Sequence, residues 1–149
     1  MTICKENYHS VLIACAPKQA SSEIIRWGEA VWWPKNSLMR FEREGAGEVK
    51  VGTRYRQKVL MPFAPSWDVE VTRLADSGIT RRFLNGMFTG EETVALKPSG
   101  PGIEVSYRMS YSINGSLNRV LWPLVFRRLH DRSIEEILAN LKEFLEKKR

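Results

Sequence analysis

The sequence predicts an α+β protein in which a mostly antiparallel sheet is followed by one long helix. Between residues 38 and 113, apolar residues alternate with charged ones and turn residues recur at short intervals, which is typical of strands joined by hairpins. After Asn114 and Gly115, apolar residues recur at intervals of three and four, the period of an amphipathic helix. The 149 residues are enough for one domain, residues 1–149, with a substantial hydrophobic core.

The segment before residue 38 is predicted to contain one strand and one or two short helices. Tyr8–Ala16 is short and apolar and ends at Pro17, which favours a buried strand. Pro17 suits the first turn of a helix, and Pro34 ends the segment that follows. That segment is rich in tryptophan, with Trp27, Trp32 and Trp33.

Turn residues divide the central region into six predicted strands. They are Leu38–Glu44, Thr53–Met61, Trp67–Leu74, Ile79–Phe88, Glu91–Lys97 and Ile103–Ile113. On even-numbered positions the sign of the charge alternates between strands, since Arg54 and Arg56 precede Asp68 and Glu70. Neighbouring strands therefore place opposite charges across from each other, and we expect this face to be solvated and rich in ion pairs.

The odd-numbered residues of these strands are mostly apolar and are predicted to form the inner face of the sheet. The long helix is predicted to present one apolar stripe to this face, through Leu117, Leu121, Leu124, Val125, Leu129, Ile134, Ile137, Leu138, Leu141 and Leu145. Pro123 is expected to kink the helix or to mark a short separate one. A capping box that starts at Ser133 predicts a further break there.

Three segments resemble parts of a known fold. They are a first strand with an alanine-proline exit, a second hairpin, and a last strand that runs into a helix: Ser10–Pro17, Gly47–Tyr55, and Gly102–Tyr111 with Asn114–Leu117. With the order and length of the elements, they make the chain resemble the START-like (SRPBCC) helix-grip superfamily, which includes polyketide cyclases/dehydrases, lipid-transfer START domains and birch-pollen allergens. The resemblance implies a curved antiparallel sheet of about six to seven strands wrapped around the C-terminal helix, with short helices between the first two strands.

The resemblance also implies a cavity between the sheet and the helix that holds an apolar molecule, such as a lipid, a polyketide or a quinone. Geometry leads to the same expectation, because one helix cannot fill the whole concavity of a twisted sheet. Trp32 or Trp33 is expected near one mouth of the cavity and Trp122 near the opposite rim. The predicted ligand-binding residues are Trp32, Trp33, Phe41, Tyr55, Gln57, Val59, Val71, Phe83, Asn85, Met87, Tyr107, Met109, Leu121, Val125 and Leu129.

Some polar residues share the predicted inner positions, namely Arg43, Gln57, Arg73, Arg81 and Asn85. The three arginines are expected near strand ends, where they reach solvent and form salt bridges. An unpaired polar group in the interior is costly. Gln57 and Asn85 are therefore expected either to contact ligand or pocket water or to hydrogen bond with each other.

The sequence contains no strong motif for a catalytic base, a metal site, a phosphate-binding loop or a disulfide framework. His9 is predicted to be structural or exposed and His130 to lie on a solvated helix face, so neither is an evident catalytic base. No spacing of His, Cys, Asp and Glu fits zinc, and the glycine-containing segment 45–52 joins two strands instead of opening a helix. We therefore predict no metal and no cofactor. Cys4 and Cys15 do not form a disulfide framework, which favours a cytoplasmic location, and Cys15 is expected to be buried.

Charge and hydropathy exclude several classes of partner. The net charge is +6, but the acidic strands compensate the basic one, so no nucleic-acid partner is predicted. No apolar run approaches the roughly 20 residues of a membrane span. The N-terminus lacks the basic and apolar regions of a signal peptide, and stable membrane insertion is not expected. A monomer and a homodimer both remain open.

Three functions fit this pattern. An inner face rich in aromatic residues and methionine favours a carrier or sensor of an apolar small molecule. The second function is an enzyme of the polyketide cyclase/dehydrase type, in which polar groups orient the substrate and polarise its carbonyls. The absence of a clear general acid or base among the inner residues argues against it. The third is a partner-binding module whose Arg127, Arg128 and basic C-terminus touch anionic lipid. The candidate groups for the enzyme are Arg43, Tyr55, Gln57, Asn85 and Tyr107.

Overall fold

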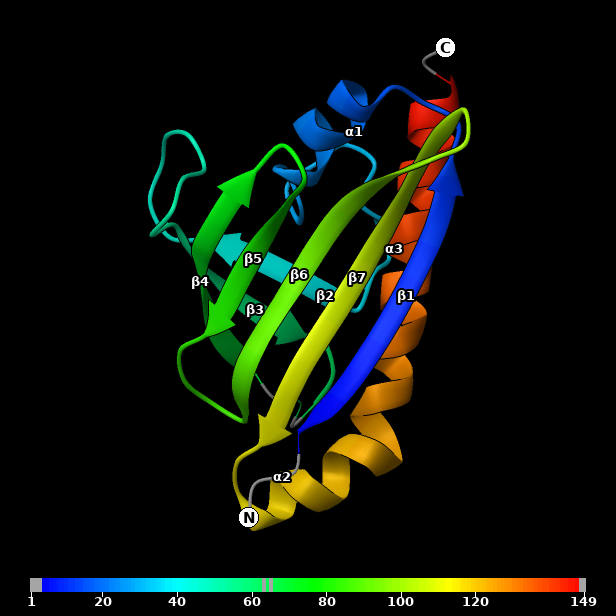
Figure 1. The fold of residues 1–149 in the computed structure, drawn as a ribbon. Coiled ribbons are helices and arrows are strands. Elements are labelled where there is room, and N and C mark those ends of the chain that lie inside the picture. The colour runs from blue at the N-terminus through cyan, green and yellow to red at the C-terminus, as the bar shows by residue number, and fades with distance from the viewer. Residues whose placement is uncertain (1–3, 63, 65, 148–149) are drawn as a thin grey trace.

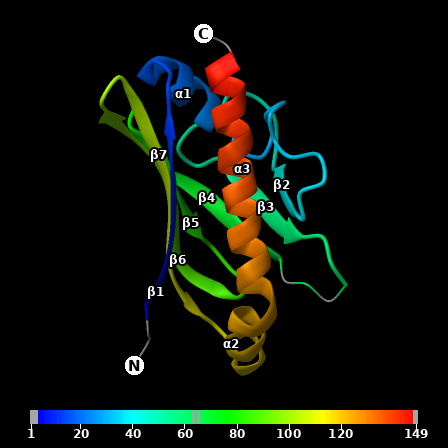
Figure 2. The same ribbon diagram turned by 90° about the vertical axis from the view of Figure 1, so that its right-hand side faces the viewer.

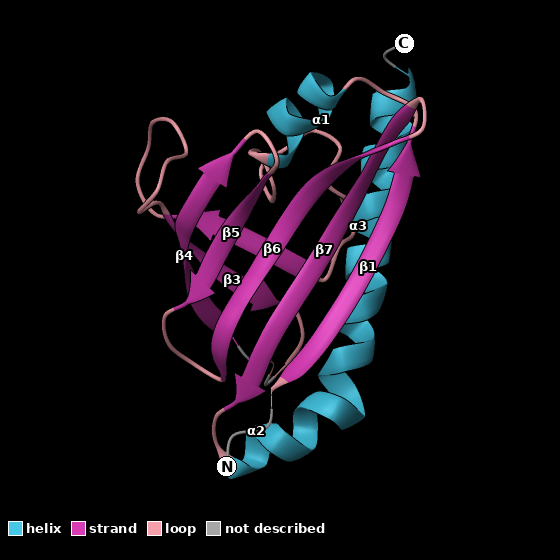
Figure 3. Ribbon diagram, viewed as in Figure 1, coloured by secondary structure: helices cyan, strands magenta, loops and turns pink. Residues whose placement is uncertain are grey.

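The computed structural model describes residues 4–62, 64 and 66–147 (Figure 1). The strands are β1 (Lys5–Ile13), β2 (Met39–Arg43), β3 (Arg54–Val59), β4 (Ser66–Ala75), β5 (Gly78–Phe83), β6 (Phe88–Ser99) and β7 (Gly102–Ile113). The helices are α1 (Pro17–Ile24), α2 (Ser116–Leu121) and α3 (Arg127–Lys147), and a π-helical turn, η1 (Trp122–Phe126), joins α2 to α3. Helices occupy the two ends and one side of the sheet (Figure 3).

Within the described residues, seven strands form one antiparallel sheet in the order β1-β7-β6-β5-β4-β3-β2. The sheet is strongly curled: in Figure 1, β2 and β3 pass behind β5, β6 and β7. Helix α3 runs along the concave side (Figure 2). The predicted architecture is therefore confirmed, with a curved sheet around a long C-terminal helix and with α1 and a tryptophan-rich loop between β1 and β2.

The outer face of the sheet has the charge pattern that the sequence predicts. The Nε atom of Arg56 lies 3.0 Å from Oδ1 of Asp68, and Nε of Arg54 lies 3.2 Å from Oε1 of Glu70. The register of β3 and β4 places both pairs directly opposite each other. The predicted ion-paired outer face is confirmed.

The connection between β5 and β6 differs from the prediction. Ile79–Phe88 was expected to be one strand, but β5 ends at Phe83 and β6 begins at Phe88. The predicted strands Ile79–Phe88 and Glu91–Lys97 leave a turn at Thr89 and Gly90, and this turn is wrong, since Gly90 pairs with Tyr111 inside β6. A Cβ atom on Gly90 would clash with the backbone of Ser110, so a glycine here allows two strands to approach closely. Because β6 begins at Phe88, its inner residues are even-numbered, whereas those of β5 are odd-numbered.

The start of the C-terminal helical segment also differs from the prediction. The buried residues there are Trp122, Phe126 and His130, whereas Leu124 is 70% exposed. The π-helical turn has a wider period than an α-helix, so buried positions recur every four residues, and Leu117, Leu124 and Val125 of the predicted stripe turn to solvent. From Ile134 onward the predicted stripe is confirmed by Ile134, Ile137, Leu138, Leu141 and Leu145, all buried. The break expected at Ser133 is wrong, because α3 is continuous through it.

The first strand lies nearer the N-terminus than predicted. It spans Lys5–Ile13 instead of Tyr8–Ala16, and the amide of Ala14 leaves the sheet to donate to Oε2 of Glu146 at 3.0 Å. Helix α1 begins at Pro17 as predicted. No helix in the described part of the chain is long and apolar enough to cross a membrane.

Candidate functional site

A group of polar side chains is buried between the sheet and α3. Each comes from a different element: Gln57 from β3, Arg81 from β5, Glu92 from β6, Tyr107 from β7 and His130 from α3. Their exposed fractions are 0% or 1%. We call these five residues the inner polar cluster. Arg81 and Glu92 lie directly opposite each other in the pairing of β5 with β6, so the register of the sheet positions the centre of the cluster.

Glu92 is the central hydrogen-bond acceptor of the inner polar cluster. Its Oε1 accepts from Nε2 of Gln57 at 2.6 Å, and its Oε2 accepts from the Tyr107 hydroxyl at 2.6 Å. Nε1 of Trp67 donates to Oε1 of Gln57 at 3.1 Å, which orients that amide. The Tyr107 hydroxyl also lies 3.4 Å from Nε2 of His130. A carboxyl, a phenol and an imidazole thus form a continuous chain.

Burial sets the protonation of this chain. It raises the pKa of the Glu92 carboxyl, although the Arg81 charge and two hydrogen bonds act in the opposite direction. It also raises the pKa of the Tyr107 hydroxyl well above its ordinary value, an effect that Glu92 strengthens. Burial lowers the pKa of His130 to about 4, so this imidazole is neutral at pH 7. The interior therefore places a neutral base beside a phenol and beside a carboxyl that holds its proton more tightly than in water.

Arg81 is a buried cation with few partners. Its Nη1 lies 3.9 Å from Oε1 of Glu92, which is close enough for an ion pair but too far for a hydrogen bond. Its Nε, Nη1 and Nη2 atoms make no hydrogen bond with any described residue. The ring centroids of Tyr55 and Phe41 lie 5.2 and 5.7 Å from the guanidinium carbon, so both rings stabilise the charge through cation–π contacts.

Further buried polar atoms in this interior are unpaired among the described residues: the Tyr55 hydroxyl, Nε1 of Trp27 and Nδ1 of His130. The indole of Trp27 stacks on the ring of Tyr107, with centroids 6.1 Å apart and planes 11° apart. Buried polar groups are usually paired, and an unpaired one costs about 1–3 kcal/mol. Such atoms are satisfied in proteins by a bound water, an ion or a ligand, or they belong to a catalytic group.

Solved structures with the same architecture cover almost the whole chain. Norcoclaurine synthase from Thalictrum flavum, in complex with a transition-state analogue, superimposes with a TM-score of 0.75 over 99% of this chain and 98% of that one, at 13% sequence identity. The chain has the START-like helix-grip fold. At this identity the likeness establishes the fold, which is the one that the sequence predicts.

Two further helix-grip structures support this assignment. Major latex-like protein 151 from Panax ginseng has a TM-score of 0.70 and 9% identity, over 95% of this chain and 97% of that one. The two-domain ARO/CYC protein StfQ of the steffimycin biosynthetic pathway has a TM-score of 0.71 and 16% identity, over 97% of this chain and 51% of that one. No family model matches the chain, and no curated protein matches it.

Most of the predicted ligand-binding residues lie on the concave side of the helix-grip sheet or beside it. Those that are buried there are Trp32, Phe41, Tyr55, Gln57, Val59, Val71, Phe83, Met87, Tyr107 and Met109. Trp33, Leu121 and Leu129 are half-buried. Trp122, expected at a rim, is fully buried and donates to the Tyr111 hydroxyl at 2.9 Å. That these side chains contact a ligand stays a prediction.

Asn85 and Val125 do not lie where the sequence predicts. Asn85 is exposed in the connection after β5, where its Nδ2 donates to Oδ2 of Asp68 at 2.9 Å. It is outside the inner face because β5 ends two residues before it. The expected hydrogen bonding between Gln57 and Asn85 is therefore wrong. Val125 is 41% exposed because the π-helical turn rotates it away from the sheet.

The arginines and His130 correct a second set of expectations. Arg43 forms the expected salt bridge, with its Nε 2.7 Å from Oε1 of Glu29, and Arg73 is exposed. Arg81 was expected at a strand end but is fully buried, because β5 lies between β4 and β6 in the middle of the sheet. His130 was expected on a solvated face, but the turn at η1 directs it inward.

Glu92 is the functional candidate that the sequence reasoning missed. Inner residues were assigned by odd number in the other strands, and none was assigned in the predicted strand Glu91–Lys97, so Glu92 was not considered. The apolar residues Phe88, Val94 and Leu96 are all even-numbered and were the signal that the inner positions change in this strand. Glu92 removes the main argument against an enzyme, because it supplies a carboxyl at the centre of the inner residues.

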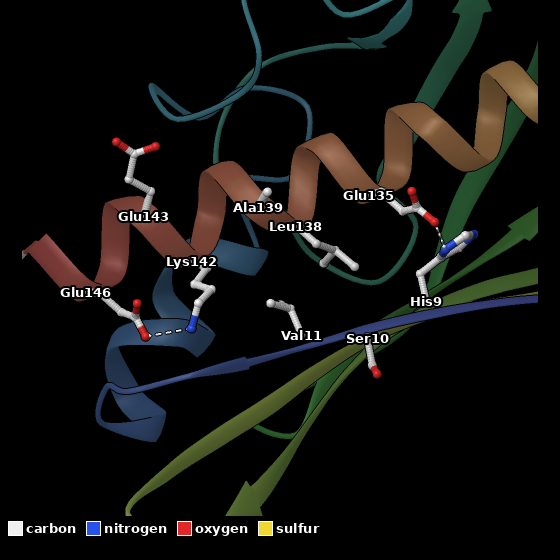
Figure 4. A pocket seen from close by; sticks show the side chains of 9 residues that line it. All are labelled: His9, Ser10, Val11, Glu135, Leu138, Ala139, Lys142, Glu143 and Glu146. Atoms are coloured by element: carbon white, nitrogen blue, oxygen red, sulfur yellow. Dashed lines mark hydrogen bonds and ion pairs between the residues drawn. The ribbon is translucent and has the colours of Figure 1, made fainter.

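Among the surface pockets of the described residues, a groove beside β1 and a pocket beside β2 lie next to this interior. A groove of about 620 Å³ lies between β1 and α3, where Val11 faces Leu138 and Lys142 pairs with Glu146 (Figure 4). A pocket of about 340 Å³ lies beside β2, which is an edge strand, and is lined in part by Trp33 and Phe41. The rings of these two residues are 5.5 Å apart. Because Phe41 also contacts Arg81, only one ring separates this second pocket from the inner polar cluster.

The remaining observations concern metal ligands and cysteines. No group of three or more His, Cys, Asp or Glu within residues 4–62, 64 and 66–147 is arranged to hold a metal ion. Cys4 and Cys15 are both free, and Cys15 is buried as expected.

The stability of the protein should depend on pH through His130. Its folded-state pKa of about 4 lies below the ordinary 6.5, so the folded state binds fewer protons than the unfolded state between these values. The free energy of unfolding is therefore highest above pH 6.5. It falls by about 3 kcal/mol in total as the pH drops toward 4, because His130 must then be protonated. Urea unfolding at several pH values should show the wild type losing this amount relative to His130→Leu. A difference between the two proteins that does not change with pH would contradict this assignment.

Proposed function

We propose that the chain binds an apolar small molecule between the sheet and α3, as a carrier or sensor, with a polar end of the molecule at the inner polar cluster. The observation that supports this most strongly is the set of unpaired polar atoms on Arg81, Tyr55 and His130 inside an otherwise aromatic and aliphatic interior. A ligand oxygen would accept from Arg81 and Tyr55, and a ligand hydroxyl would donate to His130, while the apolar body of the ligand would leave water at about 25 cal/mol per Å². Norcoclaurine synthase, which has the same fold, has been seen with dopamine and hydroxybenzaldehyde.

The pocket beside β2 is the proposed entrance. Phe41 closes it toward Arg81, and the ring of Trp33 packs edge-on against Phe41. Trp33 is half-buried and Phe41 is 7% exposed, so Phe41 is the inner of the two rings on this path. The Phe41 ring is therefore the group that has to move for a ligand to pass from this pocket to Arg81.

The direct test is a titration with the uncharged fluorescent probe N-phenyl-1-naphthylamine, together with mass spectrometry of molecules extracted from the purified protein. We expect saturable binding of one probe per chain. Tyr107→Ala should weaken it roughly tenfold, because a fully buried ring is worth on the order of 1–3 kcal/mol of contact.

Tyr8→Ala is the matched control for this titration, because Tyr8 is 46% exposed and lies on the same sheet. It should leave the affinity unchanged. If Tyr107→Ala loses stability but binds the probe as well as the wild type, the ligand lies elsewhere. If no apolar probe binds to the protein, the proposal is refuted.

A second candidate is an enzyme of the polyketide cyclase/dehydrase type, and the chain of Glu92, Tyr107 and His130 favours it. In an intramolecular aldol cyclisation a base removes a proton from a methylene carbon, a carbon–carbon bond forms to a carbonyl carbon, and an acid protonates the carbonyl oxygen. By position, His130 is the candidate base and Tyr107 the candidate acid, with Glu92 positioning the phenol through their hydrogen bond. Burial weakens both roles in the unliganded protein, because it lowers the pKa of His130 to about 4 and raises the pKa of Tyr107.

Product analysis distinguishes the enzyme hypothesis from the carrier hypothesis. A linear poly-β-ketone thioester should be converted to a cyclised, dehydrated product, and Tyr107→Phe should reduce the rate at least tenfold, since general acid catalysis contributes about 10²–10⁴-fold. Probe binding should be retained in this variant. Binding without turnover in the wild type would leave the carrier as the function.

A further inference from the structure

We propose that the molecule bound in the interior is an apolar acid, and that its carboxylate is held by the guanidinium of Arg81. This inference rests on the proposed function and specifies the class of ligand. The juxtaposition that supports it is a fully buried guanidinium with unpaired nitrogens beside a carboxyl whose two oxygens already accept other hydrogen bonds.

The geometry of Arg81 suits a planar anion. A guanidinium has five N–H donors in one plane, and a carboxylate matches two of them at once. The rings of Tyr55 and Phe41 both lie within 6 Å of its guanidinium carbon, at 5.2 and 5.7 Å. None of its three nitrogens makes a well-formed hydrogen bond with a described residue. The nearest acceptors are the Tyr55 hydroxyl, which interacts with Arg81 only weakly, and Glu92 Oε1 at 3.9 Å, so its donors can still bind a closer acceptor.

The charges around Arg81 also favour an anion. Glu92 is its only ion-pair partner among the described residues, and their closest atoms are 3.9 Å apart. The Glu92 oxygens accept from Gln57 and from Tyr107, each at 2.6 Å, so this carboxyl is held away from the guanidinium. Burial raises the pKa of Glu92, which disfavours its charged form. When Glu92 is protonated, the interior contains one uncompensated positive charge.

Other charged groups near this site pair with each other. Arg43 and Glu29, which lie near Tyr55, form a salt bridge of 2.7 Å, so their charges cancel each other. On the side of α3, His130 is neutral at pH 7 because burial lowers its pKa to about 4. Arg81 is thus the group that an incoming negative charge would meet.

Matched acid and amide probes test the inference on the wild-type protein. The pairs are 2-naphthoate with 2-naphthamide, and dodecanoate with dodecanamide, each titrated at pH 7 by calorimetry. Acid and amide have nearly the same shape, so a difference in affinity reports the charge. We expect each acid to bind at least tenfold more tightly than its amide, as is typical of a charge-assisted bidentate contact.

Variants then assign the preference to Arg81. Arg81→Met keeps the volume and should remove the preference for the acid while the amide still binds, and Arg81→Lys should retain part of it. Arg82→Met is the matched control, because the adjacent Arg82 side chain is 60% exposed on the outer face. It should bind both probes as the wild type does.

The outcomes distinguish this inference from the proposed function. If acid and amide bind with equal affinity, the carboxylate site is refuted and apolar ligand binding stands. If neither pair binds and the uncharged probe also fails, the proposed function itself falls. If the preference persists in Arg81→Met, another cation holds the acid. Because the acid–amide comparison uses the wild type, a variant that fails to fold does not prevent the test.

Discussion

Glu92→Ala is expected to lower the free energy of unfolding by about 3–5 kcal/mol, because removal of one partner of a buried ion pair leaves an uncompensated charge. The charge in question is Arg81, whose nitrogens make no hydrogen bond with a described residue. The substitution also deprives Gln57 and the Tyr107 hydroxyl of their acceptor. Urea denaturation followed by tryptophan fluorescence measures the change, since Trp67 donates to Gln57 and lies beside the site.

Two controls make this result specific to the buried carboxyl. Glu91→Ala changes the preceding residue, which is exposed, and should alter stability by less than about 0.5 kcal/mol. Glu92→Gln also removes the charge but keeps the shape and one acceptor oxygen, so it should lose less stability than Glu92→Ala, and the difference between the two variants reports the volume and the hydrogen bonds. If Glu92→Ala and Glu91→Ala are equally stable, Glu92 is not buried as the structure places it.

Trp122→Ala is expected to cost about 3–5 kcal/mol, the usual range for deleting a large aromatic side chain from a core. Trp122 is fully buried, and its ring packs edge-on against Phe88, with centroids 4.7 Å apart. Its Nε1 donates to the Tyr111 hydroxyl, so the substitution also leaves a buried hydroxyl with one partner fewer. Thermal unfolding followed by circular dichroism measures the loss.

Leu124→Ala is the matched control in the same helical segment. The recurrence of apolar residues at intervals of three and four predicted that Leu124 is buried, but it is 70% exposed. Its replacement should change stability by less than about 0.5 kcal/mol. A large loss from Leu124→Ala together with a small loss from Trp122→Ala would show that the helix faces the sheet as the leucine pattern predicts, without the π-helical turn.

Much of the fold could be predicted because it depends on local patterns. A strand has a period of two, so alternating residues identify its two faces wherever its ends are correct. This is why Tyr55, Gln57 and Tyr107 were placed inside and Arg56 outside. The long helix was recognised in the same way from Ile134 onward.

The candidate site could be predicted only in part, because its residues meet through the register of different elements. Gln57 and Tyr107 were proposed from their inner positions, but Glu92 was not, since the connection from β5 to β6 changes which residues face inward. His130 was assigned to solvent because the π-helical turn is not visible in the leucine pattern. A shift of one residue in a strand, or of one residue in a helical turn, exchanges buried and exposed positions.

The sequence by itself therefore determined the class of fold, the charged outer face and the aromatic inner face, because each follows from periodicity within one element. The tertiary structure alone decided that Arg81 lies opposite Glu92, and that Tyr107 lies between Glu92 and His130. These residues belong to four elements, and their separation depends on where hairpins turn and how the helix begins. Periodicity within a strand specifies a face but not the partner across the sheet, so the polar interior emerges only when the elements are assembled.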